Sequence, residues 1–330
     1  MIIKLEDLKA VAKKAILNYG YSESEAIVML DVMLYAQMRG NNQGVVKLIG
    51  KGIPKSAATR PIVVEKETAL SAFFDGGQNH AMVAVKYVVD VAISKAKKCG
   101  IAVVGIHQLN TSSGALGYYA RSIADSGLVG MVMCGSMETV AAAGSSQAIF
   151  GTNPFAIAVP TATQPMVFDM TTSAMAFFGV VQADTAGVPL PEGIAYDKEG
   201  SPTTKASDVL AGGALKSFDG SHKGSGLSMM IQALTGPLLH SYFTGIGDVG
   251  SNWAGHLIVA FDPELLGGLA SLKEGVSQMI EKVKATKKLP NVDEIFVPGE
   301  KGDRLTQAIL QSGEIEIEDN LYNELRKIAA

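Results

Sequence analysis

Apolar residues recur at helical spacing near the start of the chain. They share one face of an expected helix and are Leu8, Val11, Ala12, Ala15 and Ile16. Gly20 stands where this helix would end. Ser22 and Glu25 have the spacing of a capping box, which predicts a second helix over residues 23–38. Glycine, asparagine and proline then interrupt the pattern, so we expect an irregular segment up to residue 80.

From residue 81 the pattern alternates between helical segments and short apolar runs. The predicted helices cover residues 81–98, 115–125, 224–241, 271–286, 303–311 and 318–329. The predicted strands cover residues 101–106, 128–134, 156–159, 166–168 and 257–261. Such alternation indicates an α/β architecture. We expect the helical N- and C-terminal regions to pack together.

Composition narrows the class of protein. Hydrophobic residues make up 47% of the 330 positions and charged residues 18%, which favours a large buried core. The net charge of −4 gives no electrostatic attraction to nucleic acid or to anionic membranes. The chain has no apolar run of about eighteen residues and no signal-peptide pattern at its start, so we expect a cytoplasmic protein. Cys99 and Cys134 are expected to be free thiols in a reducing compartment.

One literal dinucleotide motif, GxGxxG, occurs at Gly245, Gly247 and Gly250. A phosphate-binding loop of this kind must join a strand to the start of a helix. Here the motif follows a predicted helix and leads through residues 251–253 toward a strand, which is the wrong context. We therefore assign it no function. No spacing of metal ligands occurs either, and no metal site is predicted.

Several short motifs follow one another over most of the chain. They are Gly-Ala-Leu-Gly-Tyr-Tyr-Ala at 114–120, Gly-Thr-Asn-Pro at 151–154, Phe-Asp-Met-Thr-Thr-Ser-Ala at 168–174, His-Lys-Gly at 222–224 and Pro-Gly-Glu at 298–300. Their order and spacing resemble the malate/L-lactate dehydrogenase-like family, which includes ureidoglycolate, sulfolactate and 2,3-diketogulonate oxidoreductases and piperideine-carboxylate reductases. The resemblance covers essentially the whole chain.

This resemblance implies a non-Rossmann NAD(P)-binding fold of the L-sulfolactate dehydrogenase type, with a mixed sheet. Residues 1–75 would contribute to the substrate site, residues 76–265 would form the cofactor-binding core, and residues 266–330 would form a C-terminal helical region. The resemblance also implies a homodimer that acts on a small molecule, with NAD or NADP as cofactor. A fold of its own would explain why no working glycine fingerprint is present.

The cofactor contacts that the resemblance implies can be matched to side-chain chemistry. They are Ser136, Thr152, Asn153, Pro154, Phe168, Asp169, Met170, Thr171, Thr172, Ser173, Lys223, Gly224, Pro298, Gly299 and Glu300. Hydroxyls and amides at 171–173 suit phosphate oxygens, and Lys223 adds a cation beside a glycine that a ligand can approach. Glu300 can accept hydrogen bonds from ribose hydroxyls. Taken singly, these motifs are ordinary helix caps, surface lysines and turns.

The chain departs from the family where proton transfer is expected. The family pattern Ser-His-Gly, followed three residues later by Arg, is Asn42-Gln43-Gly44 and Lys47 here. A histidine can exchange a proton, whereas Gln43 can only donate a hydrogen bond. Lys47 keeps the positive charge that grips a carboxylate but loses the fork geometry of arginine. We assign Asn42 and Lys47 to substrate binding.

A second family histidine is replaced by Ser112. Gln43, Ser112 and Tyr119 are therefore the candidate catalytic positions, with the adjacent Tyr118 also considered. His107 ends a predicted strand, where a structural role is expected. Three further histidines fall outside the matching motifs and are assigned no role; they are His80, His240 and His256.

Three hypotheses remain open at this point. The first is a reductase for a 2-oxo or 2-hydroxy acid, with water, Ser112 or a tyrosine as proton relay. The second is a reductase for 2-imino acids, whose protonated nitrogen mainly requires a hydride. The third is a protein that binds the cofactor without turnover. Loss of one general acid typically lowers a rate by about 10² to 10⁴, so the departures bear directly on this choice.

Overall fold

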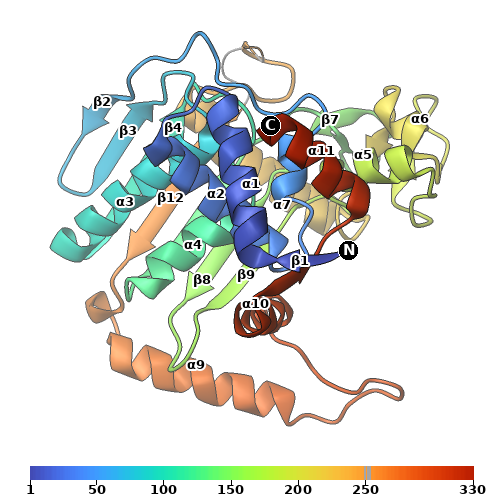
Figure 1. Cartoon of the computed structure of the whole chain (residues 1–330). Helices are drawn as coiled ribbons and strands as arrows, with labels where there is room; N and C mark the ends of the chain where they lie inside the picture. The colour runs from blue at the N-terminus through green and yellow to red at the C-terminus, as the bar shows by residue number, and fades with distance from the viewer. Residues whose placement is uncertain (249, 251–253) are drawn as a thin grey trace.

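The centre of the protein is a twisted seven-stranded sheet (Figure 1). We describe it from a computed structural model, which describes residues 1–248, 250 and 254–330. In spatial order the strands are β2 (Val63–Glu67), β3 (Ser71–Asp75), β4 (Ile101–His107), β12 (His256–Phe261), β5 (Val129–Cys134), β8 (Phe155–Val159) and β9 (Met166–Met170). β3 and β4 pair in parallel, and the other neighbours are antiparallel. The sheet is mixed, as expected.

The expectation of an irregular segment up to residue 80 was wrong for β2 and β3. These strands pair as an antiparallel hairpin at one edge of the sheet. Every residue of β2 is exposed, and the strand carries three charged side chains among its five residues. Charged edge strands of this kind resist pairing with other chains. The β2 sequence also lacks the alternation of apolar and polar residues by which a strand is recognised.

Helices cover both faces of the central sheet. α3 (Ala81–Cys99) and α4 (Leu116–Asp125) pack on one face, and α2 (Glu23–Gln37) packs against them. Their apolar residues form the main core with alternate residues of β4, namely Ala102, Val104 and Ile106. α7 (His222–Thr235) and the short 3-10 helix η2 (Pro237–Leu239) lie on the other face.

The helix predicted over residues 224–241 is interrupted. α7 ends at Thr235, and η2 begins at Pro237. Pro237 has no backbone N–H to continue the helical hydrogen bonds, and the preceding Gly236 adopts a non-helical backbone. Leu239 then reaches the sheet, because its side chain would lie 2.5 Å from a Cβ placed on Gly105 of β4.

The two ends of the chain lie side by side (Figure 1), as expected. β1 (Ile2–Lys4) pairs with β13 (Glu314–Glu316), and α1 (Leu5–Asn18) packs on α11 (Asp319–Ala329). The predicted capping box of α2 is present, with Ser22 and Glu25 exchanging hydrogen bonds. α10 (Glu300–Ser312) precedes β13. α9 (Leu269–Lys284), which follows the 3-10 helix η3 (Pro263–Leu265), lies along one side and has no buried residue.

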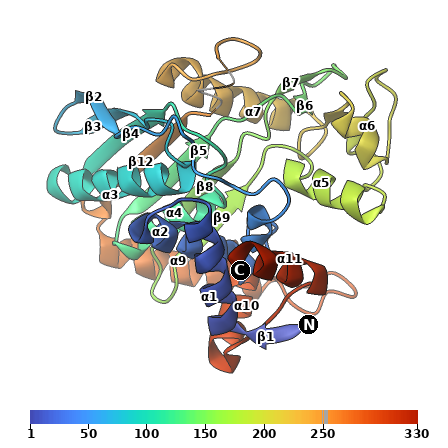
Figure 2. The same cartoon turned by 45° about the horizontal axis from the view of Figure 1, so that its top comes forward.

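A second, smaller unit stands to one side of the central sheet, on the side of α5 and α6 in Figure 2. Its four-stranded sheet has the order β10 (Ala195–Tyr196), β11 (Ala214–Leu215), β6 (Val140–Ala141) and β7 (Ala148–Phe150). α5 (Phe177–Ala186) and α6 (Ala206–Leu210) complete it around a separate apolar cluster. This unit lies inside the range assigned to one cofactor-binding core, and the division into three regions stays a prediction. No helix in the described part of the chain is long and apolar enough to cross a membrane.

Candidate functional site

The strand register gathers the predicted site residues at one end of the central sheet. β5 ends at Cys134, opposite the start of β12 at His256. β8 begins opposite the end of β5, and β9 ends opposite the start of β8. Antiparallel neighbours therefore place Ser136, Thr152 and the residues after Met170 at the same end, although they are distant in sequence. The loop after β4, which contains Ser112, leaves the sheet at this end as well.

Thr171, Thr172 and Ser173, here called the hydroxyl turn, follow directly on β9. This turn pairs with the chain just before α7. The N–H of Phe218 donates to the Thr172 carbonyl at 2.9 Å, and Ser173 and Ser217 form an antiparallel bridge. The hydroxyl turn therefore lies beside the start of α7, where Lys223 is exposed. The structure brings these two predicted cofactor segments together.

Further hydroxyls continue from this turn toward β5. Ser136 Oγ lies 3.2 Å from Thr152 Oγ1, and the Thr172 N–H donates to the Thr152 carbonyl at 2.8 Å. Ser136 and Thr152 are half-buried, whereas Thr172 is fully buried and also donates its hydroxyl to Thr152. Ser136 and Thr152 are accessible to a ligand, while Thr172 holds the turn in place.

Asn153 connects the loop of Ser136 to α7 through hydrogen bonds. Its side chain is fully buried, and Nδ2 donates to Gln232 Oε1 at 2.7 Å and to the Ser228 carbonyl at 3.1 Å, both on α7. Its Oδ1 accepts a hydrogen bond of 3.2 Å from the Ser136 N–H. Asn153 thus positions Ser136 against α7, and its own polar atoms are already bonded. Two other residues of the predicted cofactor set, Pro154 and Met170, are half-buried.

Phe168 and Asp169, like Met170, lie on the edge strand β9. Phe168 is 40% exposed and packs edge-on against Phe155. Asp169 turns its carboxylate toward the start of α4, where the Gly117 N–H donates to Oδ2 at 2.7 Å. Burial of this carboxylate raises the pKa of Asp169 to about 6, while the Gly117 hydrogen bond acts in the opposite direction.

The expectation that a ligand approaches the Gly224 backbone needs correction. Asp219 Oδ1 already accepts hydrogen bonds from the N–H groups of Ser221, at 3.0 Å, and Gly224, at 3.2 Å. Hydrogen bonds from Ser221 and Gly224 lower the pKa of Asp219 to about 2. A Cβ on Gly224 would stand 2.4 Å from Asp219 Oδ1, so the glycine makes room for this carboxylate. Lys223 and nearby hydroxyls remain for a phosphate.

The Pro-Gly-Glu motif (Pro298, Gly299 and Glu300) lies along the same edge strand. A Cβ on Gly299 would meet the Val167 carbonyl at 3.0 Å, and the φ of +85° also favours glycine there. Val167 and the hydroxyl turn are separated by about 13 Å, at 3.3 Å per residue along β9. The predicted cofactor segments therefore line one edge of the sheet.

Glu300 is bonded within the protein. Its carboxylate forms ion pairs with Lys284 and, at 2.6 Å, with Arg304. A pocket of about 260 Å³ opens beside it and is lined by Pro298, Glu300, Lys284, Arg304 and Gln164, among others. A ribose hydroxyl would have to share the Glu300 carboxylate with these two cations.

Four predicted catalytic and substrate-binding residues form what we call the substrate cluster: Asn42, Gln43, Lys47 and Ser112. The cluster contains both positions at which the sequence predicts that a family histidine is missing. Lys47 lies in the 3-10 helix η1 (Val45–Leu48), and its Nζ donates to Ser112 Oγ at 3.3 Å. Gln43 Nε2 donates to Asn42 Oδ1 at 3.2 Å. All four side chains belong to half-buried residues. Tertiary structure therefore brings together, in one site, the two segments predicted to depart from the family pattern.

The start of α5 lies against the substrate cluster. The Phe178 ring centroid lies 5.4 Å from Lys47 Nζ, and Asn42 Nδ2 would be 3.5 Å from a Cβ on Gly179. Phe178 follows the hydroxyl turn by only five positions, so the cluster adjoins the predicted cofactor site. Sequence reasoning missed Phe178, because an apolar residue in an apolar stretch carries no signal of a cation nearby.

Burial sets the charge state of Lys47. Loss of hydration lowers the pKa of its ammonium group to about 8, from an ordinary value of 10.5. No acidic residue contributes to this shift, and no carboxylate forms an ion pair with Lys47 among the residues that the structure describes. The cluster thus holds a cation whose own charge is not neutralised by the protein.

The environment of Tyr119 does not suit its predicted role as a proton donor. Its side chain is fully buried, and its hydroxyl donates to the Ser113 carbonyl at 2.7 Å. Burial raises the pKa of Tyr119 well above its ordinary value, so the phenol holds its proton tightly. The neighbouring Tyr118 packs edge-on against it, and burial raises its pKa to about 12.

The histidines have structural partners. His107 stacks on Phe73, and its Nε2 lies 3.1 Å from Glu65 Oε2, as expected of a structural residue. His80 caps α3 by accepting the Met82 N–H at 3.2 Å. His256 Nε2 lies 2.9 Å from Ser113 Oγ, next to the substrate cluster. Burial lowers the pKa of both His80 and His256 to about 3, so both are neutral at pH 7.

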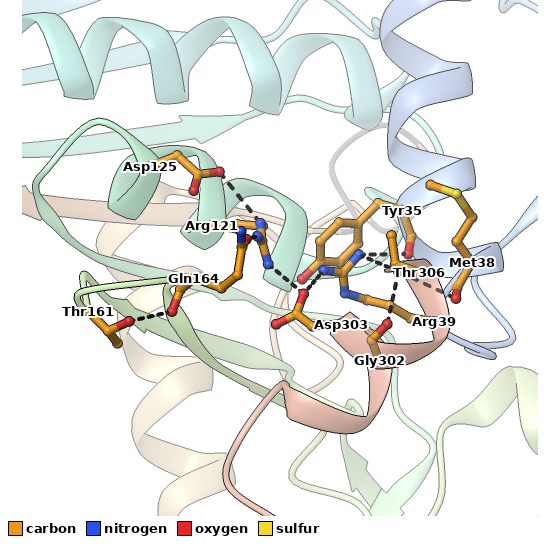
Figure 3. A network of polar contacts seen from close by, with 10 residues as sticks. All are labelled: Tyr35, Met38, Arg39, Arg121, Asp125, Thr161, Gln164, Gly302, Asp303 and Thr306. Carbon is orange, nitrogen blue, oxygen red and sulfur yellow. Dashed lines mark hydrogen bonds and ion pairs between the residues drawn. The ribbon is translucent and has the colours of Figure 1, made fainter. Parts of the chain in front are cut away.

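A polar network joins the N-terminal helices to α10 (Figure 3). Asp303 accepts hydrogen bonds from Arg39 at the end of α2 and, at 2.7 Å, from Arg121 on α4. Arg121 also contacts Gln164 in the loop between β8 and β9. Asp303 lies one turn beyond Glu300, so the network ties the Pro-Gly-Glu motif to the segment before Asn42. Asp303 is 182 positions from Arg121 and 264 positions from Arg39, so no local pattern in the sequence indicates these pairs.

The literal glycine motif follows the 3-10 helix η2, in line with the expectation that a helical segment precedes it. Gly245 and Gly247 have positive φ values in a turn after η2, and the Gly245 N–H donates to Glu138 Oε1 at 2.5 Å. The next described strand along the chain is β12. Residues 251–253, through which the motif was expected to lead, lie outside the described residues.

The sequence of the chain is similar to those of known oxidoreductases. A model of the malate/L-lactate dehydrogenase family matches residues 3–326. A Δ1-pyrroline-2-carboxylate/Δ1-piperideine-2-carboxylate reductase of Pseudomonas putida is 34% identical over 275 residues, covering 79% of this chain and 80% of its own. An NAD(+) ureidoglycolate dehydrogenase of Escherichia coli is 30% identical over 338 residues, covering 98% and 95%.

The fold comparison agrees. The solved structure of malate dehydrogenase from Pyrococcus horikoshii superposes with a TM-score of 0.86 at 31% identity, covering 99% of this chain and 95% of that one. The expected α/β fold with a mixed sheet is therefore confirmed.

Proposed function

Because the chain belongs to the malate/L-lactate dehydrogenase family, we propose that it transfers a hydride between a nicotinamide dinucleotide and a small 2-oxo or 2-hydroxy acid. The observation that carries this proposal is the position of the substrate cluster. Lys47 and Ser112 lie beside the end of the sheet where the predicted cofactor residues gather. One unneutralised cation beside hydroxyl and amide donors suits a small carboxylate.

The residues present fit a dinucleotide. Hydroxyls of Ser136, Thr152 and Thr171, with the Lys223 cation, provide the donors that a diphosphate requires. The Pro-Gly-Glu motif would hold the opposite end against β9. When bound, the nicotinamide ring supplies or accepts the hydride. We propose NAD or NADP as the cofactor.

The substrate cluster would bind and orient the acid. Lys47 attracts the carboxylate, and Asn42 and Gln43 offer amide N–H groups. Ser112 presents a hydroxyl to the oxygen of the reacting carbon. The Phe178 ring limits water beside Lys47 and thereby strengthens these interactions.

A second candidate substrate class is the cyclic 2-imino acids. Neither Gln43 nor Ser112 can replace a histidine as an acid by itself, and a protonated imine already carries its proton. The similarity to the P. putida reductase points the same way. We do not retain a role without turnover, because the similar proteins are named for the reactions that they catalyse.

Cofactor binding and turnover test the proposal together. Titration of the protein with NADH and NADPH, followed by fluorescence, should give saturable binding that weakens at least ten-fold in Lys223→Ala. The matched control is Lys198→Ala, at an exposed lysine outside the site. The loaded protein is then assayed with pyruvate, oxaloacetate and a cyclic imine carboxylate. No binding of either dinucleotide at millimolar concentration would overturn the assignment.

We further propose a cytoplasmic homodimer. α9 and the adjoining loop expose apolar side chains, including Leu266 at 83% and Met279 at 47%. An apolar groove of about 530 Å³ runs beside α9 and is lined by Val129, Val159, Phe261, Leu272 and Val276, among others. Exposed apolar surface of this kind is typical of an interface between subunits. Light scattering that reports a monomer at micromolar concentration would contradict the dimer.

A further inference from the structure

The hydrogen bonds around Ser112 have a direction. Ser112 Oγ accepts from Lys47 Nζ at 3.3 Å and from the Gly114 N–H at 3.2 Å. A serine hydroxyl has two acceptor lone pairs and one donor hydrogen, so both acceptor positions are used. No acceptor for the Ser112 O–H group is found among the residues that the structure describes. The hydrogen is left to point toward a ligand in the cluster, where Ser112 is half-buried.

Lys47 is the ionisable member of the substrate cluster, since Asn42, Gln43 and Ser112 have no proton to exchange near neutral pH. The groups that face it from neighbouring elements are neutral. His80, at the start of α3, is the titratable residue whose pKa Lys47 influences, and burial keeps that imidazole uncharged. Phe178, from α5, presents a ring. No carboxylate in the described part of the chain holds the Lys47 proton in place.

We propose, on the basis of the proposed function, that Lys47 is the proton source of the reaction and delivers the proton through the hydroxyl of Ser112. In the direction of reduction, the carbonyl carbon receives the hydride and its oxygen takes the Ser112 proton. Ser112 Oγ takes a proton from the Lys47 ammonium group along the existing hydrogen bond. Lys47 is left as a neutral amine and regains a proton from solvent. One hydride and one proton are consumed, and a hydroxyl group is formed.

The charge state of Lys47 suits this role. A general acid works best when its pKa lies near the working pH, and burial lowers the pKa of Lys47 to about 8. Arginine at this position would bind a carboxylate but could not give up a proton. Asn42 and Gln43 would then carry a larger share of carboxylate binding, with Lys47 close by.

The test begins with the ammonium group itself, independently of activity. Lysines of the whole protein are dimethylated with ¹³C-formaldehyde, and their NMR signals are followed against pH. The signal that disappears in Lys47→Arg should titrate with a midpoint near 8. Lys51→Arg is the matched control, because Lys51 is an exposed lysine of the same segment and its loss should remove a different signal. A midpoint near 10.5 for the Lys47 signal would overturn the proposal.

Steady-state kinetics test the relay. For wild-type protein with a 2-oxo acid, kcat for reduction should fall above about pH 8. Lys47→Arg should lower kcat at pH 7 by about 10² and remove the fall up to pH 10. Ser112→Ala should lower kcat comparably while the Lys47 NMR signal remains. Lys51→Arg should retain the wild-type profile.

The outcomes separate the relay from the function on which it rests. Turnover of a 2-oxo acid with an unchanged kcat and pH profile in Lys47→Arg would overturn the relay alone. Turnover only of a cyclic imine, insensitive to Lys47→Arg, would overturn the relay and favour the imino acid as substrate. Absence of turnover with every 2-oxo and imino acid would overturn the proposed function and the relay with it, whatever the NMR titration shows.

Discussion

Lys47 Nζ donates a hydrogen bond of 3.3 Å to Ser112 Oγ, although the two residues are 65 positions apart. Both stand at positions where the sequence predicts a departure from the family pattern, and the fold places them in direct contact. The two predicted departures therefore belong to one site. They have consequences for stability as well as for chemistry.

Lys47→Met should stabilise the folded protein at pH 7 by about 1–3 kcal/mol. The folded-state pKa of about 8 lies below the ordinary 10.5, so a cation is held in the fold at a cost when the pH is below 8. A shift of this size corresponds to about 3 kcal/mol, and partial exposure of the residue lowers that value. Urea denaturation at pH 7 measures the change.

The sign of this effect depends on pH. Between about pH 8 and 10.5 the unfolded chain binds more protons at Lys47, so the stability of wild-type protein rises with pH. The difference between Lys47→Met and wild type should accordingly shrink as the pH rises from about 8 to 10.5. Lys51→Met, at an exposed lysine, is the control. A Lys47→Met variant that is less stable at pH 7 would contradict the buried-cation explanation.

Restoring an imidazole should separate the two substrate classes. If a 2-oxo acid is the substrate, Gln43→His should raise kcat for its reduction by about ten-fold or more, because a positioned acid contributes in this range. Combination with Ser112→His tests whether the second family position adds to the gain. For an imino acid the same variants should gain nothing. Wild-type turnover of pyruvate at hundreds per second would show that the acid of this site has been misassigned.

Asp303→Asn should destabilise the protein by about 2–4 kcal/mol. Asp303, Arg39 and Arg121 expose only 18%, 13% and 16% of their side chains, so removal of the carboxylate leaves two largely buried cations without a partner (Figure 3). Because Asp303 also anchors the start of α10, NADH affinity should fall as the Pro-Gly-Glu motif loosens. Asp319→Asn is the control, since that exposed ion pair with the N-terminus is worth less than about 1 kcal/mol. Equal effects of the two variants would contradict this account.

Acidification should destabilise the fold through His256. Its folded-state pKa of about 3 lies below the ordinary 6.5, because burial disfavours the imidazolium. The unfolded chain therefore binds the proton first, and stability falls as the pH drops from 6.5 toward 3. At pH 5 this one residue should cost about 2 kcal/mol relative to pH 7.

His256→Gln removes the titrating group and can keep a hydrogen bond to Ser113. The variant should therefore lose about 2 kcal/mol of the change in unfolding free energy between pH 7 and pH 5. The matched control is His222→Gln, at an exposed histidine. An identical pH dependence in His256→Gln and wild type would show that His256 does not drive acid destabilisation.

Local pattern in the sequence determined most helices and the buried strands of this protein. Helical periodicity and the Ser22–Glu25 capping box place α2 correctly, and apolar runs place β4, β5 and β12 within about one residue. These features arise from contacts between near neighbours and from burial on a regular face. The order of the motifs also indicated the family, which the comparisons confirm.

Tertiary structure alone decided where those elements meet and what the site contains. β2 is stabilised by pairing with β3 rather than by its own apolar pattern, so its charged sequence conceals it. The sequence identified Lys47 and Ser112 as separate departures, and placed Tyr119 beside them although it is buried. Contact, burial and the resulting pKa of Lys47 depend on residues brought from distant segments, chiefly Ser112 and Phe178. Desolvation is a property of the packed environment, and no local pattern encodes it.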